Sequence, residues 1–258
     1  MFLAIDIGNT NVTIGLMTDE GDVRREWRLT TRREQTSDEL HVTMRFLPGF
    51  EEIARADWSG AAVCSVAPML NLSMLRVVRE LTGSEPLLLE PKMPLAVRNA
   101  TDSPSDVGMD RLANAVAGVE KHGAPLIVVD FGTATTLDII SPGREYLGGV
   151  ILPGIEATID ALHARTAKLP RVQLARPRAA IGRSTVQAML AGLYFGCVDA
   201  VDGARKRVES ELGAPCRLVA TGGLAKVVGP DIPNLHAVDE HLTLHGIHSI
   251  WRSTVAPA

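Results

Sequence analysis

The sequence Ile127-Val-Val-Asp130-Phe-Gly132-Thr-Ala-Thr-Thr136-Leu-Asp-Ile-Ile140 repeats the pattern of an earlier segment, Leu3-Ala-Ile-Asp6-Ile-Gly8-Asn-Thr10-Asn-Val-Thr-Ile-Gly-Leu16. In each copy an apolar strand leads into Asp-x-Gly, then into Thr or Asn, and then into a second β-rich run. The glycine permits a tight turn between the two strands. Two copies separated by almost half the chain predict two similar domains and not a solenoid, whose repeats span ~20–50 residues.

The rest of the sequence alternates short apolar runs with segments of helical periodicity, which is typical of α/β proteins. Gly83 is expected to end the helix at 69–81. Lys121-His-Gly-Ala-Pro125 interrupts the pattern, so a boundary is expected between 115 and 125, with one domain in 1–120 and another in 121–258. Strands are expected at 61–64, 86–89 and 218–220, and helices at 69–81, 106–119 and 184–212.

The composition is that of a globular protein and gives no sign of a nucleic-acid or membrane partner. Hydrophobic residues make up 46% and charged residues 22% of the 258 positions, which disfavours disorder. The net charge is −4, and Arg32-Arg33, the densest basic stretch, is interpreted as a solvated loop. No apolar run approaches the ~20 residues of a membrane helix. Three scattered cysteines without a CxxC motif are typical of a reducing cytosol, so we expect a cytoplasmic protein.

The two repeated turns are suited to binding phosphate. Backbone N–H groups, an amide and a hydroxyl at the turn Gly8-Asn9-Thr10 can cradle phosphate oxygens, and Asp6 just before it can hold Mg²⁺ through water. Asp130-Phe-Gly132-Thr133 forms a second such turn, and two facing turns would clamp a polyphosphate. Thr221-Gly222-Gly223 would add a close backbone approach for the sugar and base. Neither a Walker motif nor a GxGxxG after a strand occurs, which disfavours those two phosphate-binding folds.

Gly108-Met109-Asp110-Arg111 lies near the start of an expected helix and has the chemistry for an alcohol that also carries a carboxylate. A carboxylate with an ordinary pKa of ~3.9 is ionised at neutral pH and can accept the proton of an attacking hydroxyl. The adjacent guanidinium can bind a carboxylate through two hydrogen bonds. The spacing alone leaves open a second interpretation, an aspartate at a helix start beside a surface arginine.

These segments and three others named below, taken together and in order, resemble the motifs of type III pantothenate kinases, a family within the actin, hexokinase and heat-shock ATPase superfold. The resemblance implies an α/β protein with two duplicated ribonuclease-H-like domains and mixed sheets around a central cleft. It also implies ATP-dependent phosphorylation of pantothenate, the first step of coenzyme A biosynthesis. The segments that carry it are Asp6-x-Gly-Asn-Thr10, Ser65-Val-Ala-Pro68, Gly108-x-Asp110-Arg111, Asp130-Phe-Gly-Thr-Ala-Thr-Thr136, Gly148-Gly149-Val-Ile-Leu-Pro153-Gly154 and Ile181-Gly-Arg-Ser-Thr185.

The resemblance also implies a set of site residues. Asp110 corresponds to the general base, and Asp130 to the ligand of an activating K⁺ or NH₄⁺ ion, while Mg²⁺ accompanies ATP. Thr185 corresponds to a threonine that reaches the substrate from the partner subunit of a homodimer. The implied ATP contacts are Asp6, Ile7, Gly8, Asn9, Thr10, Asn11, Val12, Thr13 and Thr133, and the implied pantothenate contacts are Gly108, Met109, Asp110, Arg111 and Thr185.

The long helix expected at 184–212 carries Gly192 and Gly196 four residues apart, where two backbones can approach closely. The spacing fits packing within one chain or between two chains equally well, and the resemblance favours a dimer interface. One departure from the family concerns Thr101, because the family often has a tyrosine there that touches the substrate. A smaller side chain at this position puts substrate affinity in doubt more than reaction type.

Two other functions remain open from the sequence. One is a kinase of the same superfold that acts on another small molecule, such as a sugar or acetate, and the other is a catalytically inactive accessory or regulatory relative. His241, His245 and His248 are four and three residues apart, so one helix face can gather them as a metal site would. We interpret this segment instead as a flexible C-terminal surface.

Overall fold

The computed structural model describes residues 1–49, 53 and 56–255 of the chain, which folds into two compact units. Unit 1 consists of Met1–Arg98, Asp102–Ala117 and the chain from His241 onward. Unit 2 consists of Asn99–Thr101 and Gly118–Glu240. The domain predicted at 121–258 therefore differs from unit 2, because the last helix of the chain belongs to unit 1.

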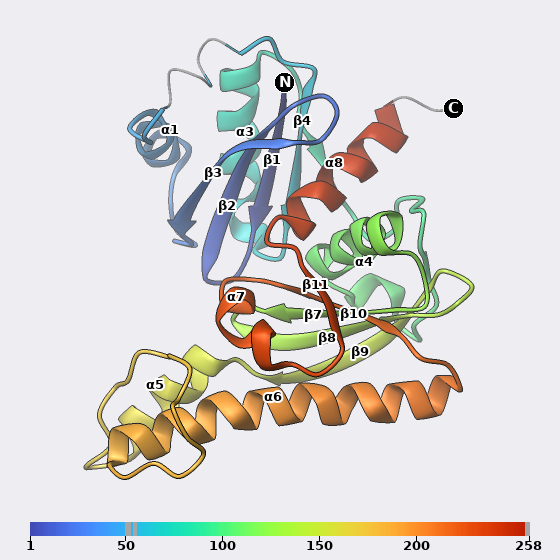
Figure 1. Cartoon of the computed structure of the whole chain (residues 1–258). Coiled ribbons are helices and arrows are strands. Elements are labelled where there is room, and N and C mark those ends of the chain that lie inside the picture. The colour runs from blue at the N-terminus through green and yellow to red at the C-terminus, as the bar shows by residue number, and fades with distance from the viewer. Residues whose placement is uncertain (50–52, 54–55, 256–258) are drawn as a thin grey trace. The chain divides into compact units, whose positions relative to one another are not determined.

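Unit 1 is built on a mixed sheet in the strand order β3-β2-β1-β4-β5 (Figure 1). β1 pairs with β2 in antiparallel fashion and with β4 in parallel fashion. Because β1 is central and covered on both faces, its sequence is almost continuously apolar. The strands are β1 (Phe2–Ile7), β2 (Asn11–Met17), β3 (Val23–Thr30), β4 (Gly60–Ser65) and β5 (Leu87–Leu88).

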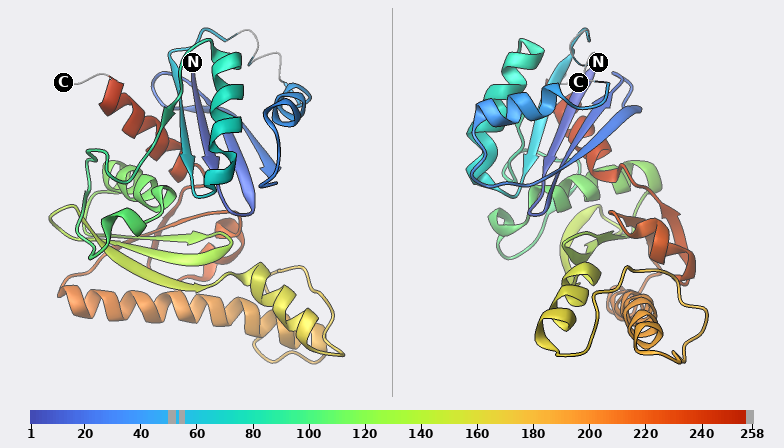
Figure 2. Two further views of the ribbon diagram at one scale, coloured as in Figure 1. Left: turned by 180° about the vertical axis from the view of Figure 1, so that it is seen from behind. Right: turned by 90° about the vertical axis from the view of Figure 1, so that its left-hand side faces the viewer.

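Helices cover both faces of this sheet (Figure 2). α1 (Ser37–Arg45) and α3 (Asn71–Thr82) pack on one face, where Leu40, Met44 and Met74 join the core of β1. α3 ends at Gly83, whose φ of 71° is left-handed as expected for a helix-ending glycine. α8 (Leu242–Val255) covers the other face, and its Trp251 ring packs on Phe2 with 4.6 Å between ring centroids.

The interpretation of the C-terminal histidines as a flexible surface is wrong. His245 and His248 lie on α8 and His241 directly precedes it. His248 is only 5% exposed, with its ring 5.0 Å from that of Phe2. His241 Nδ1 lies 2.9 Å from Glu26 Oε2 on β3. Apolar residues elsewhere on α8 dictate this packing, and the histidines occupy the same contact surface. Within the part of the chain that the structure describes, no group of three His, Cys, Asp or Glu side chains could hold a metal ion.

Unit 2 repeats the architecture of unit 1, as the duplicated motif predicts. Its sheet has the order β11-β10-β7-β8-β9-β6, so β9-β8-β7-β10-β11 correspond to β3-β2-β1-β4-β5 in both order and direction. This confirms the predicted α/β fold with two mixed sheets of one topology. The strands are β6 (Arg98–Asn99), β7 (Leu126–Phe131), β8 (Ala134–Ile140), β9 (Glu145–Pro153), β10 (Arg217–Thr221) and β11 (Leu235–Val238).

The helices of unit 2 bury one face of its sheet. α5 (Ile155–Arg165), α6 (Thr185–Leu212) and α7 (Ala225–Val228) share a core with Ile127, Val129 and Leu137. The N-terminal end of α6 lies beside α5 (Figures 1 and 2). α6 begins after Ser184, whose side chain accepts a hydrogen bond from Gln187 N, so the predicted N-cap is confirmed.

α4 (Met109–His122) starts three residues later than expected. Pro104–Asp106 forms a separate 3-10 turn with proline in its first turn, and the chain is extended at Val107 before α4 begins. This shift places Asp110 in the first turn of the helix. No helix among the described residues is long and apolar enough to span a membrane.

Candidate functional site

The turn between β1 and β2 is closely braced by the segment that follows β3. Gly8 N donates to Asn11 O at 2.9 Å, and a side chain at Gly8 would crowd this oxygen at 3.0 Å. Thr31 Oγ1 donates to Gly8 O at 2.8 Å, and Thr31 N donates to Thr10 O at 2.9 Å. The backbone of the predicted phosphate turn is therefore held from outside before any ligand binds.

The predicted ATP-binding residues of this hairpin divide into two groups. Asn9, Thr10 and Asn11 are exposed at the tip. Ile7 and Val12 are 0% and 2% exposed and belong to the core of unit 1. Only the backbone of these two residues is available to a ligand, because their side chains are buried in that core.

A thiol and two carboxylates meet at the ends of β1 and β4. Asp6 pairs with Cys64 in the parallel register, and Cys64 is completely buried. Burial raises the pKa of the Cys64 thiol well above its usual range, and the Asp6 and Asp110 carboxylates and a hydrogen bond to Asp6 raise it further. Cys64 is therefore a neutral donor facing Asp6, with Asp110 nearby. This cluster gathers two of the predicted site residues in one place.

The Gly108-x-Asp110-Arg111 segment presents a half-buried carboxylate at the start of α4. Burial raises the pKa of Asp110, while the Arg111 N–H, at 2.8 Å from Asp110 Oδ1, and the Arg111 guanidinium act in the opposite direction. A Cβ on Gly108 would overlap Asp110 Oδ1 and lie 3.4 Å from Val66, so only glycine leaves room for this carboxylate. Met109 is 2% exposed, and its side chain is not available to a substrate.

In unit 2, Asp130 lies at the end of β7 between two glycines. Thr221 pairs with Asp130 in the parallel register of β10 and β7. Gly222 follows with a φ of 90°, and a Cβ there would overlap Asp130 Oδ1. A Cβ on Gly132 would be 3.4 Å from the same oxygen. Gly222 therefore approaches a carboxylate, a contact that the sequence did not predict.

Thr133 and Thr185, the other predicted site residues of unit 2, belong to different elements. The Thr133 carbonyl oxygen lies against Gly154, the residue before α5, where any Cβ would overlap it. Thr185 is exposed in the first turn of α6. Thr101, where the family often has tyrosine, donates from Oγ1 to Asn99 Oδ1 at 2.8 Å and faces Gly148.

Sequence reasoning missed a buried polar pair in unit 2. Tyr146 donates its hydroxyl proton to Asp138 Oδ1 at 2.6 Å, and both residues are 0% exposed. The signal was present, because Asp138 interrupts an otherwise apolar strand in Thr136-Leu-Asp-Ile-Ile140. A charged residue inside a strand that is buried on both faces requires a buried partner.

Known proteins resemble the chain over nearly its full length. The family model described as type III pantothenate kinase matches residues 2–207. The chain belongs to the type III pantothenate kinase family. A type III pantothenate kinase from Moorella thermoacetica is 41% identical over 251 residues, which are 97% of this chain and 98% of the relative. As a member of the family, the chain is a kinase, a transferase that uses ATP.

Solved structures agree with the two-domain actin- and hexokinase-like fold of this family member. A Campylobacter jejuni protein described as a Baf family transcriptional activator superposes with a TM-score of 0.62 at 21% identity, and the match covers 98% of each chain. The ethanolamine utilization protein EutJ from Carboxydothermus hydrogenoformans gives a TM-score of 0.56 at 15% identity, covering 95% of this chain and 88% of EutJ. At such identities the likeness concerns the fold alone.

Proposed function

We propose that this kinase phosphorylates pantothenate with ATP, with Asp110 as the general base, and so catalyses the first step of coenzyme A biosynthesis. The observation that carries the proposal is the half-buried Asp110 carboxylate in the first turn of α4, beside Arg111 and close to the Asp6–Cys64 pair. Gly108 leaves room for this carboxylate, because a Cβ there would overlap Asp110 Oδ1.

The reaction follows from what each group can do. Asp110 accepts the proton of the primary hydroxyl of pantothenate as its oxygen forms a bond to the γ-phosphorus of ATP. The bond between this phosphorus and the oxygen that it shares with the β-phosphate breaks, and ADP leaves with the electron pair. Arg111 binds the pantothenate carboxylate through its guanidinium, which matches a carboxylate with two parallel hydrogen bonds.

Two cations complete the proposal. Asp6 is suited to hold the Mg²⁺ that accompanies ATP, because Mg²⁺ binds through one or two carboxylates and keeps much of its water. Asp130 is suited to hold K⁺ or NH₄⁺, since its carboxylate lies where the backbone of Gly222 approaches it so closely that a Cβ there would overlap its Oδ1. Such a cation would supply positive charge near the phosphates. Thr133 and the backbone of residues 6–13 would contact ATP.

The proposal also includes a homodimer through α6, with Thr185 reaching the substrate of the partner subunit. Gly192, Gly196 and Gly203 leave open space on the surface of α6, where an added Cβ would meet nothing within 4 Å. A groove of about 220 Å³ runs beside this surface. Its apolar lining includes Leu152, Pro153, Ile155, Leu193 and Cys197. An exposed face of small residues next to an apolar groove supports close packing of a second helix.

The decisive experiment measures ADP release with and without pantothenate, in K⁺ and in its absence. We expect release that depends on pantothenate, and a fall of about 10²–10⁴-fold in kcat for Asp110→Asn, the usual contribution of a general base. Asp106→Asn is the matched control, because Asp106 is exposed in the preceding 3-10 turn and should leave the rate unchanged. Undiminished activity of Asp110→Asn would contradict the assigned role.

The same assay separates the two alternatives. Release of ADP with another alcohol, and none with pantothenate, would indicate a kinase for a different small molecule. Nucleotide binding without turnover on any alcohol would indicate an inactive relative.

A further inference from the structure

The segment after β3 contacts all three residues of the turn after β1, Gly8, Asn9 and Thr10. Thr31 binds the backbone oxygens of Gly8 and Thr10. Arg33 donates from Nη2 to the side-chain Oδ1 of Asn9 at 3.3 Å. The guanidinium therefore lies at the exposed tip of the turn that is proposed to bind the ATP phosphates.

The bond between Arg33 and Asn9 is a weak one for a guanidinium. Its length exceeds the usual range of about 2.7–3.2 Å, and the acceptor is a neutral amide at the exposed surface. Arginine has five donors in a planar fork that matches phosphate, and hydrogen bonds between charged partners are roughly twice as strong as neutral ones. A phosphate oxygen beside Asn9 would be the better acceptor.

The charges around the turn also favour a bond from Arg33 to phosphate over its bond to Asn9. Asp6 and Asp110, which both act on Cys64, bring two carboxylates to this end of the sheet. A triphosphate here needs compensating positive charge, and the chain has no Walker lysine to supply it. Arg111 is assigned to the pantothenate carboxylate, so Arg33 is the cation that already touches the turn.

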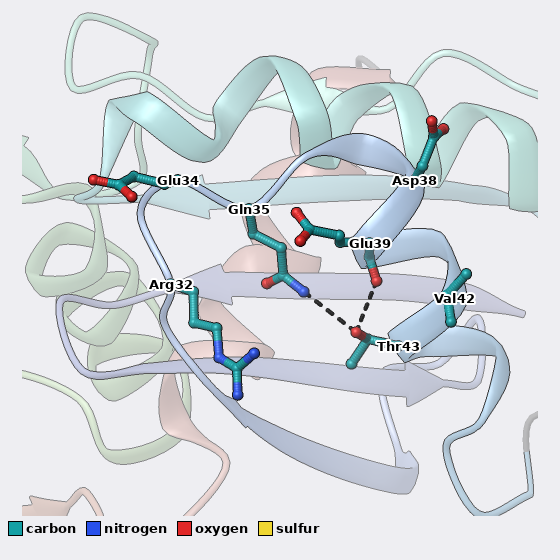
Figure 3. Close-up of a pocket in the computed structure, with 7 residues that line it drawn as sticks. All are labelled: Arg32, Glu34, Gln35, Asp38, Glu39, Val42 and Thr43. Atoms are coloured by element: carbon teal, nitrogen blue, oxygen red, sulfur yellow. Dashed lines mark hydrogen bonds between the residues drawn. The ribbon is translucent and has the colours of Figure 1, made fainter.

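The neighbouring Arg32 lies in different surroundings. Figure 3 shows it among the residues that line a groove, with Gln35, Glu39 and Thr43. The groove has a volume of about 630 Å³, and in it Gln35 Nε2 donates to Thr43 Oγ1 at 3.2 Å. Glu39 is fixed there by reciprocal hydrogen bonds with Thr36 that begin α1, and the Arg32 charge contributes to lowering the pKa of Glu39. The two adjacent arginines thus lie in different surroundings, Arg32 in the lining of the groove and Arg33 at the turn.

We propose that Arg33 is a phosphate-binding residue of this kinase, whose guanidinium leaves Asn9 for the β- and γ-phosphate oxygens when ATP binds. The inference rests on the proposed role of the turn and adds a residue that the sequence analysis interpreted as part of a solvated loop. It concerns nucleotide binding alone and does not depend on the identity of the alcohol.

The test measures binding of Mg²⁺ with a non-hydrolysable ATP analogue by calorimetry, for the wild type and for Arg33→Ala, Arg33→Gln, Arg33→Lys and Arg32→Ala. We expect Kd to rise roughly 10- to 100-fold in Arg33→Ala, as for the loss of hydrogen bonds to a charged group. Lysine keeps the charge without the fork and should recover part of the affinity. Arg32→Ala should bind within about twofold of the wild type, since ordinary surface changes have small effects.

Arg33→Gln separates a phosphate contact from a purely structural one. Glutamine can still donate to Asn9 but carries no charge, so the proposal predicts that it binds the analogue as weakly as alanine while adenosine binding is unchanged. Recovery by glutamine, equal losses in Arg32→Ala and Arg33→Ala, or full affinity in Arg33→Ala would overturn the role of Arg33 alone. A wild type that binds adenosine but not the triphosphate analogue would overturn the role of the turn as well.

Discussion

At Asp110, burial and a neighbouring arginine act on one carboxylate in opposite directions. Burial disfavours the charged form and raises the pKa, while the Arg111 N–H and guanidinium favour the charged form. A general base must be ionised to accept a proton, so its activity is lost as the pH falls through its pKa. Because burial is the larger influence, this loss should begin at a higher pH than the ordinary value of ~3.9 for aspartate implies.

Removing the Arg111 charge should therefore move the acid limb of the kcat/KM profile to higher pH. In Arg111→Met the opposing charge is gone and the pKa of Asp110 rises further, whereas Arg111→Lys keeps a charge and should keep the limb close to that of the wild type. Both variants should raise the KM for pantothenate, because neither has the guanidinium fork. Superimposable acid limbs for the methionine variant and the wild type would show that the two groups are not coupled.

At the scale of elements, the duplicated strand–turn–strand was predictable because its signal is local. An apolar run, a glycine and a second apolar run specify a hairpin, and the repeat specifies two of them. The start of α6 was predictable for the same reason, since Ser184 caps it through a residue three positions away. The predicted site residues all belong to such local motifs.

The contacts that were missed join segments far apart in the sequence. Gly222 approaches Asp130 because β10 pairs with β7, and Arg33 reaches Asn9 because β3 ends beside the first turn. The packing of α8 on unit 1 was missed for the same reason, since Trp251 near the end of the chain contacts Phe2 near its start. No local pattern encodes such register, which depends on the completed sheets.

The pairing of β10 with β7 yields a prediction about the cation. Gly222→Ala should raise the K⁺ concentration for half-maximal activity about tenfold or more, as for changes next to a metal ligand, because the new Cβ displaces the Asp130 carboxylate. Gly213→Ala is the matched control, since Gly213 is also left-handed, with a φ of 67°, but a Cβ there meets nothing within 4 Å.

Both glycine variants should lose about 1–3 kcal/mol of stability, because alanine is strained in that backbone region. Gly222→Ala should lose more than Gly213→Ala, because its Cβ would also lie 2.7 Å from the backbone nitrogen of Phe131. Thermal unfolding measures these losses of stability, and the K⁺ titration measures the effect on the Asp130 carboxylate. An identical K⁺ requirement in the two variants would remove Asp130 from the proposed cation site.

At the scale of the whole molecule, the question is whether one chain makes a complete site. Thr185 stands at the exposed start of α6, and the open glycine face of this helix continues toward its C-terminal end. If a second copy packs there, each site takes Asp110 from one subunit and Thr185 from the other. The two residues can then be tested on separate chains.

Mixing two defective proteins tests this division directly. Asp110→Asn and Thr185→Ala are each expected to be impaired in pantothenate phosphorylation as pure proteins. After co-refolding in equal amounts, half of the dimers are mixed, and each mixed dimer has one site with an intact Asp110 and an intact Thr185. In a symmetric dimer with shared sites, about a quarter of the wild-type kcat/KM should return. Sites completed within one chain would instead give only the average of the two defective proteins, because every Asp110 would then be accompanied by a mutated Thr185 or be mutated itself.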